Sequence, residues 1–387
     1  MTLSDIAEYV TERISSEKVN LEEYISTDSL LQNKCGRGIS SNLPPEPCSL
    51  TAFEPGDVLV ANIRPYLKKV WRADIRGGAS LDVLVYRAKC GVSSEFLYSV
   101  LMQDSFYAYA MLGAKGTKMP RGDKDQMMRF PIKQLPKELC TSIGRLICNI
   151  DAKIAVNRHI NHNLEALARR LYDYWFVQFD FPDAGGRPYK SSGGEMENGL
   201  PKQWRKGTLA EIADITMGQS PDGSSYNNHG EGSLFYQGCT DFGLRFPKVR
   251  QYTTSPTRFA KKGDILMSVR APVGAVNIAN NDCCIGRGLA ALCPKNGSTT
   301  FLFLVIGYLK EAFDRKNVAG TTFGAITKEE LHNMEVIIPS QEVVTRFEQL
   351  MGEVFYRQMI LGDEINRLTK LRDELLPLLM NGQVNLV

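Results

Sequence analysis

Residues 136–179, the first of two long heptad repeats, read PKELCTSIGRLICNIDAKIAVNRHINHNLEALARRLYDYWFVQF, and residues 339–380 read PSQEVVTRFEQLMGEVFYRQMILGDEINRLTKLRDELLPLLM. In each stretch mostly apolar side chains recur at heptad positions a and d, which predicts a long helix with an apolar seam. The first seam consists of Ile143, Ile150, Asn157, Leu164 and Leu171 at a, and Ile147, Ile154, Asn161, Ala168 and Trp175 at d. The second consists of Phe347, Val354, Leu361, Leu368 and Leu375 at a, and Met351, Gln358, Ile365, Arg372 and Leu379 at d. Every position is displaced by the same 204 residues, so the sequence repeats in register.

The length of these helices indicates how they pack. A helix of about 40 residues is roughly 60 Å long, which exceeds the diameter of a small domain. Each helix must therefore pack beyond its own domain, most simply against the other helix as an antiparallel coiled coil. The first seam is polar at its centre, where Asn157 and Asn161 stand. Buried Asn can fix helix register, although these side chains could equally face water or a partner.

The duplication extends to the globular parts of the chain. A Leu-led helix start comes at Leu3 and Leu209, and a Gly-Asp turn before an apolar strand comes at Gly56 and Gly263. We therefore predict two homologous α/β (α+β) domains with an internal pseudo-twofold repeat, separated by two long antiparallel coiled-coil helices. The expected boundaries are domain 1 at 1–135, the first spacer helix at 136–180, a Gly/Ser/Pro-rich connector at 181–204, domain 2 at 205–338, and the second spacer helix with a tail at 339–387.

Composition indicates an ordinary globular protein. Of 387 residues, 43% are apolar and 23% are charged, with a net charge of +3. No signal peptide or membrane-spanning run is recognisable. The nine cysteines are scattered without metal-ligand spacing, which favours reduced thiols, no metal and a cytoplasmic location.

The basic residues are concentrated in one stretch of each repeat. Residues 60–90 hold seven basic and two acidic residues, a net charge of +5, and residues 245–295 hold nine and two, a net charge of +7. A local positive surface attracts a polyanion such as DNA. One such patch could be no more than a solvated surface, but two at equivalent places favour a function.

The candidate DNA-binding residues lie in these stretches and in flexible loops whose hydroxyls, amides and bases suit phosphates and base edges. In the first repeat they are Arg64, Lys68, Lys69, Arg72, Lys115, Thr117, Lys118, Arg121 and Lys124. In the second repeat they are Gln219, Ser220, Ser224, Tyr226, Arg245, Lys248, Arg270, Arg287, Thr321 and Thr322. We identify no phosphate-binding loop, dinucleotide fingerprint, amino-methyltransferase tetrapeptide or metal-nuclease triplet, and therefore predict no catalytic residues.

The chain resembles the specificity subunits of type I restriction–modification enzymes over essentially its whole length. The resemblance is carried by the segments Gly116–Asp123, Trp175–Phe179, Ile215–Tyr226, Gly286–Ala290 and Glu374–Gln383. It implies two target-recognition domains, each reading one half of a split, asymmetric site in double-stranded DNA, with the helices setting the spacer between the halves. It also implies docking of two methyltransferase subunits and, in the full complex, of motor-nuclease subunits, with no membrane partner. No cofactor is expected on this chain; S-adenosylmethionine, and ATP and Mg²⁺ for restriction, are expected on the partners.

Three alternatives remain open. The partner could be a fused methyltransferase-nuclease in a related system, a choice that this sequence does not decide. The chain could itself be a DNA adenine methyltransferase, against which the missing motifs argue. It could also be a coiled-coil scaffold with protein-binding domains, which salt-dependent binding to a preferred duplex would exclude.

Overall fold

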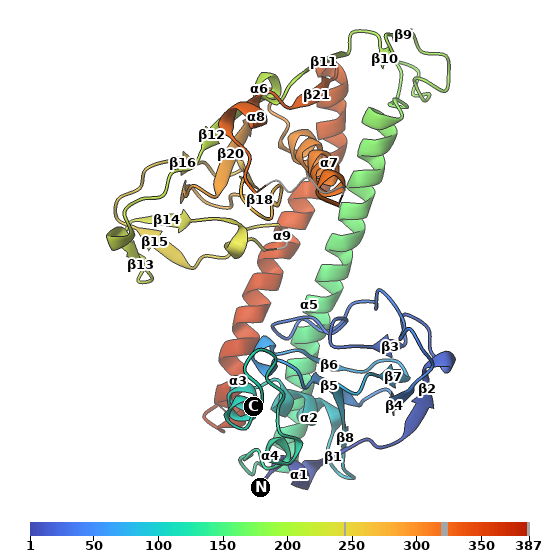
Figure 1. Ribbon diagram of the computed structural model, residues 1–387, viewed down its shortest axis with the longest axis vertical. Coiled ribbons are helices and arrows are strands. Elements are labelled where there is room, and N and C mark those ends of the chain that lie inside the picture. Colours follow the sequence, from blue (N-terminus) through green and yellow to red (C-terminus); the bar gives the residue numbers. More distant parts are fainter. Residues whose placement is uncertain (244, 319–323, 385–387) are drawn as a thin grey trace. The chain divides into compact units, whose positions relative to one another are not determined.

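The computed structural model of the chain describes residues 1–243, 245–318 and 324–384. The chain divides into two compact units (Figure 1). Unit 1 comprises Met1–Val156 and Ile365–Val387, and unit 2 comprises Asn157–Glu364. Each unit combines sheets with helices, which confirms the predicted mixed α/β class. None of the helices in the described part of the chain has the length and apolar character needed to cross a membrane.

Unit 1 contains two four-stranded sheets. The first has the antiparallel order β1 (Ala7–Tyr9), β8 (Val83–Ala88), β5 (Val58–Ala61), β6 (Val70–Arg72). The second has the order β2 (Arg13–Ser15), β4 (Ser49–Phe53), β7 (Gly77–Ala79), β3 (Tyr24–Ile25), and its β3–β7 pair is parallel. Val58 and Val60 of β5 face one apolar core while Leu59 and Ala61 face another. The continuous apolar run of β5 thus reflects burial on both faces of the first sheet.

Unit 2 repeats this plan. Its antiparallel sheet has the order β12 (Ala213–Met217), β20 (Leu289–Pro294), β17 (Ile265–Ser268), β18 (Val276–Ile278). Its mixed sheet has the order β13 (Tyr226–Asn227), β15 (Gln251–Thr253), β14 (Ser233–Tyr236), β19 (Cys283–Ile285), β16 (Phe259–Ala260), and its β14–β19 pair is parallel. Two further pairings join β11 (Arg205–Thr208) with β21 (Glu335–Ile338), and β9 (Met196–Glu197) with β10 (Leu200–Pro201) in the connector. β17 again divides its side chains between two cores, with Ile265 and Met267 on one side and Leu266 on the other.

The helices also correspond between the units. Unit 1 has α1 (Leu3–Ile6), η1 (Ser16–Lys18), η2 (Pro65–Leu67), α2 (Ser94–Leu101), α3 (Asp104–Leu112) and α4 (Lys124–Met128). Unit 2 has α6 (Leu209–Ile212), η4 (Gly223–Ser225), η5 (Cys239–Asp241), α7 (Thr299–Val318) and α8 (Lys328–His332). The first helix of each unit begins with a capping box, formed by Thr2 with Asp5 and by Thr208 with Glu211. In a capping box two side chains satisfy backbone N–H groups that the helix itself leaves unpaired, so the same short signal starts both repeats.

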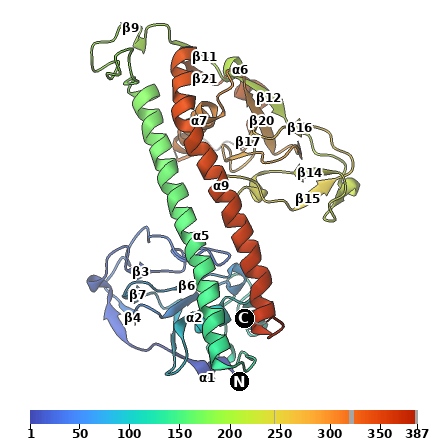
Figure 2. The same ribbon diagram turned by 180° about the vertical axis from the view of Figure 1, so that it is seen from behind.

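The two heptad stretches form α5 (Lys137–Tyr172), which continues as a π-helical turn η3 (Asp173–Val177), and α9 (Gln341–Met380). Each unit holds part of both helices, and there the two run side by side in both views (Figures 1 and 2). In unit 1 the predicted seam residues belong to two apolar cores. The first core contains Ile143, Ile147, Leu375 and Leu379, and the second contains Ile150, Ile154, Ile365 and Leu368. In unit 2 the core takes Leu171, Trp175, Phe347, Met351 and Val354. Leu361 is also buried, and Leu164 is half-buried.

The polar centre of the α5 seam is buried in unit 2. Asn157 is completely buried and donates through Nδ2 to Glu364 at 2.8 Å, while the main-chain oxygen of Asn161 accepts from Gln358 Nε2 at 3.3 Å. Among the described residues, neither Asn157 Oδ1 nor Asn161 Oδ1 has a hydrogen-bond partner. These side chains therefore carry an energetic cost, as expected where polarity serves register rather than stability.

Replacing both Asn157 and Asn161 with Leu is expected to raise the free energy of unfolding of unit 2 by about 1–2 kcal/mol, because two unsatisfied buried oxygens are removed. On the expectation that the two units read separate DNA half-sites, the same change should loosen helix register without altering which half-sites are chosen. Urea unfolding measures the first effect, and preference among DNA spacer lengths measures the second. Asn163→Leu, at an exposed position of the same helix, is the control. An unchanged spacer preference in the double variant would count against the register role.

Candidate nucleic-acid interface

In unit 1 two loops far apart in the sequence form one surface, called loop cluster 1 here and consisting of residues 62–68 and 113–124. The Arg64 N–H donates to the Pro120 carbonyl at 2.7 Å, and the Gly122 N–H donates to the Asn62 carbonyl at 3.1 Å. A β-bridge between Ile63 and Arg121 joins the same two loops. The fold thus brings the first basic stretch against the Gly-Thr loop, a juxtaposition that sequence spacing alone does not provide.

Most of the predicted DNA-binding residues of the first repeat lie on loop cluster 1. Its exposed members are Lys115, Thr117, Lys118, Arg121 and Lys124, and its half-buried members are Arg64 and Lys68. Lys68 is 2.9 Å from Asp104, Arg121 is 2.9 Å from Asp82, and Lys115 is 3.7 Å from Asp123. Exposed ion pairs of this kind contribute little and are screened by salt. A DNA phosphate could therefore replace the carboxylates as their partner.

Two predicted residues of the first repeat lie elsewhere. The Lys69 ammonium donates to the Thr27 carbonyl, and the Arg72 guanidinium donates to Glu95 at 2.7 Å and to Ser94 at 3.1 Å. These bonds link β6 and its flanks to neighbouring segments of unit 1. Lys69 and Arg72 thus have partners within the fold, away from loop cluster 1.

In unit 2 the corresponding surface, loop cluster 2, consists of residues 218–226, 269–271, 286–288 and 324–326. The Gly218 N–H donates to the Leu289 carbonyl at 2.9 Å, and the Gln219 N–H donates to the Ile285 carbonyl at 3.0 Å. A side chain on Gly218 would not fit, because its Cβ would lie 2.2 Å from the Gly286 carbonyl oxygen. The Gly286-Arg-Gly288 segment is therefore a close-packed turn that holds Arg287 on the surface.

Loop cluster 2 gathers six of the predicted residues of the second repeat, namely Gln219, Ser220, Ser224, Tyr226, Arg270 and Arg287. The Ser220 hydroxyl accepts from the Arg287 N–H at 3.2 Å and from Gln237 Nε2 at 2.8 Å. Ser224 and Tyr226 have intramolecular partners, since their hydroxyls donate to Asp222 at 2.6 Å and to the Pro221 carbonyl at 3.0 Å. Arg270 and Arg287 are exposed and form no ion pair with a described residue.

The remaining predicted residues of the second repeat lie outside this surface. Lys248 is exposed on the loop after η5. Arg245, in contrast, is only 6% exposed and pairs with Glu165 of α5, so its charge is used inside unit 2. In the sequence Arg245 belongs to the basic stretch of the second repeat, but its side chain is not on the surface. Thr321 and Thr322 fall outside the described residues.

Three residues on or beside these surfaces were not predicted. Tyr66, on η2, exposes 49% of its surface on loop cluster 1. Gln237 binds Ser220, and Arg258 is exposed beside Thr257, whose hydroxyl donates to the Gln219 carbonyl at 2.5 Å. An aromatic ring, an amide and a guanidinium suit nucleic acid. Of these three residues, only Gln237 could have been predicted from the sequence, because it is the polar residue that directly follows the apolar strand β14.

The two surfaces are built by equivalent contacts. In unit 1 the Asn62 N–H donates to the Asp82 carbonyl at 2.8 Å, and in unit 2 the Val269 N–H donates to the Gly288 carbonyl at 3.0 Å. The bridge between Ile63 and Arg121 likewise has its counterpart between Arg270 and Ala325. Conserved backbone contacts thus present different side chains in each unit.

The carboxylates at these surfaces act as caps. Asp123 caps α4, and hydrogen bonding from the Gln126 backbone lowers the pKa of its carboxyl group. The Ser224 hydroxyl and backbone similarly lower the pKa of Asp222, which caps η4. Among the described residues, no group of three or more His, Cys, Asp or Glu is placed to hold a metal ion.

Comparison with known proteins gives consistent results. Residues 201–355 match the family described as type I restriction modification DNA specificity domain. A Methanocaldococcus jannaschii protein, whose name assigns it to the type I restriction enzyme MjaX as specificity subunit, is 34% identical over 68% of this chain, and the match spans 61% of that protein's length. The type I restriction enzyme HindI specificity subunit of Haemophilus influenzae is 22% identical over 99% of this chain and 98% of its own.

A solved structure shares the fold. The S subunit of a type I restriction–modification system from M. genitalium is 15% identical and covers 98% of this chain and 95% of its own, with a TM-score of 0.59. The matches in sequence all point to one family. The chain belongs to the family of type I restriction–modification specificity subunits.

Proposed function

We propose that this chain is the DNA-recognition subunit of a type I restriction–modification complex and is not catalytic by itself. Each unit reads one half of a bipartite, asymmetric site in double-stranded DNA. The observation that carries the proposal is the doubled surface, in which equivalent backbone contacts form loop clusters 1 and 2. One recognition surface would serve a single continuous site, whereas two suit a divided one.

The two half-sites differ because the side chains at equivalent places differ. Arg121 of loop cluster 1 corresponds to Ala325 of loop cluster 2, and Asp82 corresponds to Gly288. Arg donates two hydrogen bonds to guanine, and a carboxylate accepts from cytosine, whereas Ala and Gly offer no such groups. Two copies of one fold can therefore select unrelated bases, so the complete site is asymmetric.

The long helices set the spacer between the half-sites. At 1.5 Å per residue α5 is about 54 Å long and α9 about 60 Å long. A separation of tens of ångströms corresponds to more than one turn of duplex at about 3.4 Å per base pair. We therefore also propose the domain arrangement expected from the sequence. In it, an antiparallel pair of helices joins the two recognition domains.

Two methyltransferase subunits dock on the outward faces of the helices. Leu167 of α5 and Tyr174 of η3 are 50% and 38% exposed, and Leu371 and Leu378 of α9, 204 residues later, are 42% and 39% exposed. Exposed apolar side chains repeated in register provide two equivalent docking surfaces. S-adenosylmethionine binds to these partners, and ATP and Mg²⁺ serve the motor-nuclease subunits that complete the complex.

Charged substitutions on one docking surface should remove one partner. We expect Leu167→Glu with Tyr174→Glu, or Leu371→Glu with Leu378→Glu, to reduce the complex from two methyltransferase subunits to one, because a carboxylate cannot be buried unpaired. Native mass spectrometry of the purified complex measures this ratio. Leu112→Glu, at an 82% exposed position on α3, is the control and should retain both subunits. Retention of two subunits by both paired variants would contradict the docking surfaces.

The function is tested by mapping methylated adenines in the genome of the host. A bipartite motif with a constant gap that disappears when this gene is deleted is the expected result. Purified chain with its partner should also bind that duplex, with affinity falling steeply as salt rises because phosphate contacts release counterions. A continuous motif, or methylation by this chain without a partner, would contradict the proposal.

A further inference from the structure

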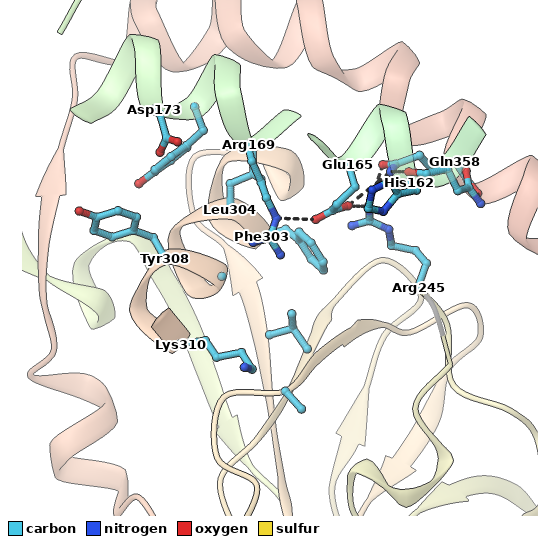
Figure 3. Close-up of a pocket in the computed structure, with 15 residues that line it drawn as sticks. His162, Glu165, Arg169, Asp173, Arg245, Phe303, Leu304, Tyr308, Lys310 and Gln358 are labelled. Carbon is cyan, nitrogen blue, oxygen red and sulfur yellow. Dashed lines mark hydrogen bonds and ion pairs between the residues drawn. The ribbon is translucent and has the colours of Figure 1, made fainter. Parts of the chain in front are cut away.

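Arg245 of unit 2 connects a loop of the globular part to both long helices (Figure 3). Its Nη2 donates to Glu165 of α5 and, at 2.8 Å, to Gln358 of α9. The guanidinium also lies over two aromatic rings, 4.4 Å from the centroid of Phe303 and 4.7 Å from that of Phe355. Burial lowers the pKa of Arg245, which Glu165 opposes by favouring the charged form. A single side chain thus joins three elements of unit 2.

A cavity lies beside this contact. Its volume is about 460 Å³, and its lining includes Glu165 and Arg169 of α5, Leu304 and Lys310 of α7, and Val276 of β18 (Figure 3). The cavity interrupts the packing of the globular part against α5, which resumes where the Tyr172 ring lies 6.2 Å from those of Phe301 and Tyr308 of α7. Directional bonds from Arg245 therefore contribute more to the orientation of the globular part than they would in a filled interface.

Unit 1 has a corresponding contact, made by Lys34. This side chain is only 5% exposed, and its Nζ lies 2.8 Å from Asp104 of α3 and 3.4 Å from Asp373 of α9. The loop that carries it is held by backbone bonds, in which the Lys34 N–H donates to the Lys68 carbonyl at 2.8 Å. A buried cation of a loop again reaches a carboxylate on a long helix.

Lys34 and Arg245 occupy the same place in the repeat. Lys34 comes nine residues after Ile25, the last residue of β3, and Arg245 comes nine residues after Tyr236, the last residue of β14. β3 and β14 are the equivalent strands, since each forms the parallel pair of its mixed sheet. The two contacts are therefore one feature present in both copies.

We propose that Arg245 and Lys34 are positioning residues that fix the orientation of each recognition domain on the helices of its own unit. This inference rests on the proposed function and extends it, because the spacer between half-sites then depends on these two contacts as well as on helix length. Well-packed apolar side chains would stabilise such an interface at least as well as a buried ion pair. Charge and hydrogen bonds supply direction, which a recognition domain needs in order to meet DNA at one angle.

The test uses Arg245→Met and Lys34→Met in the complete complex. Neither substitution leaves a carboxylate without a cation. Glu165 keeps its ion pair with Arg169, Asp104 keeps its pair with Lys68, and Asp373 keeps its pair with Arg372. Lys370→Met, which removes a cation whose partner Glu374 lies on the same helix, is the matched control. Arg245→Lys retains the charge but not the planar guanidinium.

The measurement is binding to duplexes that carry both mapped half-sites at the native spacing and at spacings one base pair shorter or longer. We expect wild type and Lys370→Met to discriminate against the altered spacings by about tenfold or more, and the two Met variants to lose most of that discrimination while both half-site sequences stay the same. Arg245→Lys should recover part of it. Unaltered discrimination in both Met variants, each verified as folded by circular dichroism, would overturn the inference. Absence of any bipartite motif for wild type would instead overturn the proposed function.

Discussion

Replacing Arg372 with Met is expected to destabilise unit 1 by about 3–5 kcal/mol, since it leaves a largely buried carboxylate without its cation. Arg372 is 1% exposed and donates from Nη1 to Asp151 of α5 at 2.6 Å. Asp151 also accepts from the Tyr98 hydroxyl at 2.5 Å, and Arg372 bonds Asp373 at 2.9 Å. Within unit 1 this network joins α2, α5 and α9.

The loss should appear as faster hydrogen exchange in the unit 1 parts of these helices and as a lower urea midpoint for the unit 1 transition. Lys370→Met, two residues away on the exposed face of α9, should change stability by less than about 0.5 kcal/mol. Removing both charges with Arg372→Met and Asp151→Leu should restore much of the lost stability, because no unpaired charge is then buried. A single Arg372→Met variant as stable as the control would show that the network is not needed for stability.

Replacing Gly218 with Ala is expected to weaken DNA recognition by unit 2 strongly. The added Cβ would lie 2.2 Å from the Gly286 oxygen and 2.8 Å from the Leu289 oxygen, so backbone must move. Overpacking of this kind costs about 1–3 kcal/mol. The shift would displace Gln219 and Arg287, and we expect affinity for the second half-site to fall by about 100-fold, as for the loss of one or two base contacts.

Gly223→Ala in the same loop is the matched control, because a Cβ there meets no atom within 4 Å. It should leave affinity within about twofold of wild type. Duplexes that carry only the first or only the second half-site separate the effects, since loop cluster 1 belongs to unit 1 and should be unaffected by either change. Equal affinities of the Gly218→Ala and Gly223→Ala variants for the second half-site would exclude loop cluster 2 from the interface.

Elements that depend on local pattern could be predicted from the sequence. Heptad spacing located α5 and α9, because a helix must bury a stripe that recurs every three or four residues. The repeat and the apolar runs of β5 and β17 indicated two related mixed α/β units, because each strand buried on both faces needs a continuous apolar run.

Which residues lie together and which are exposed could not be predicted from local pattern, because both depend on contacts between distant segments. Arg245 and Arg287 look alike in sequence, but long-range contacts bury the first against Glu165 and leave the second on a surface turn. Loop cluster 1 likewise forms through pairing of Ile63 with Arg121, residues far apart in the chain. Composition and periodicity report only on near neighbours, whereas the environment of a charge depends on distant segments that fold against it.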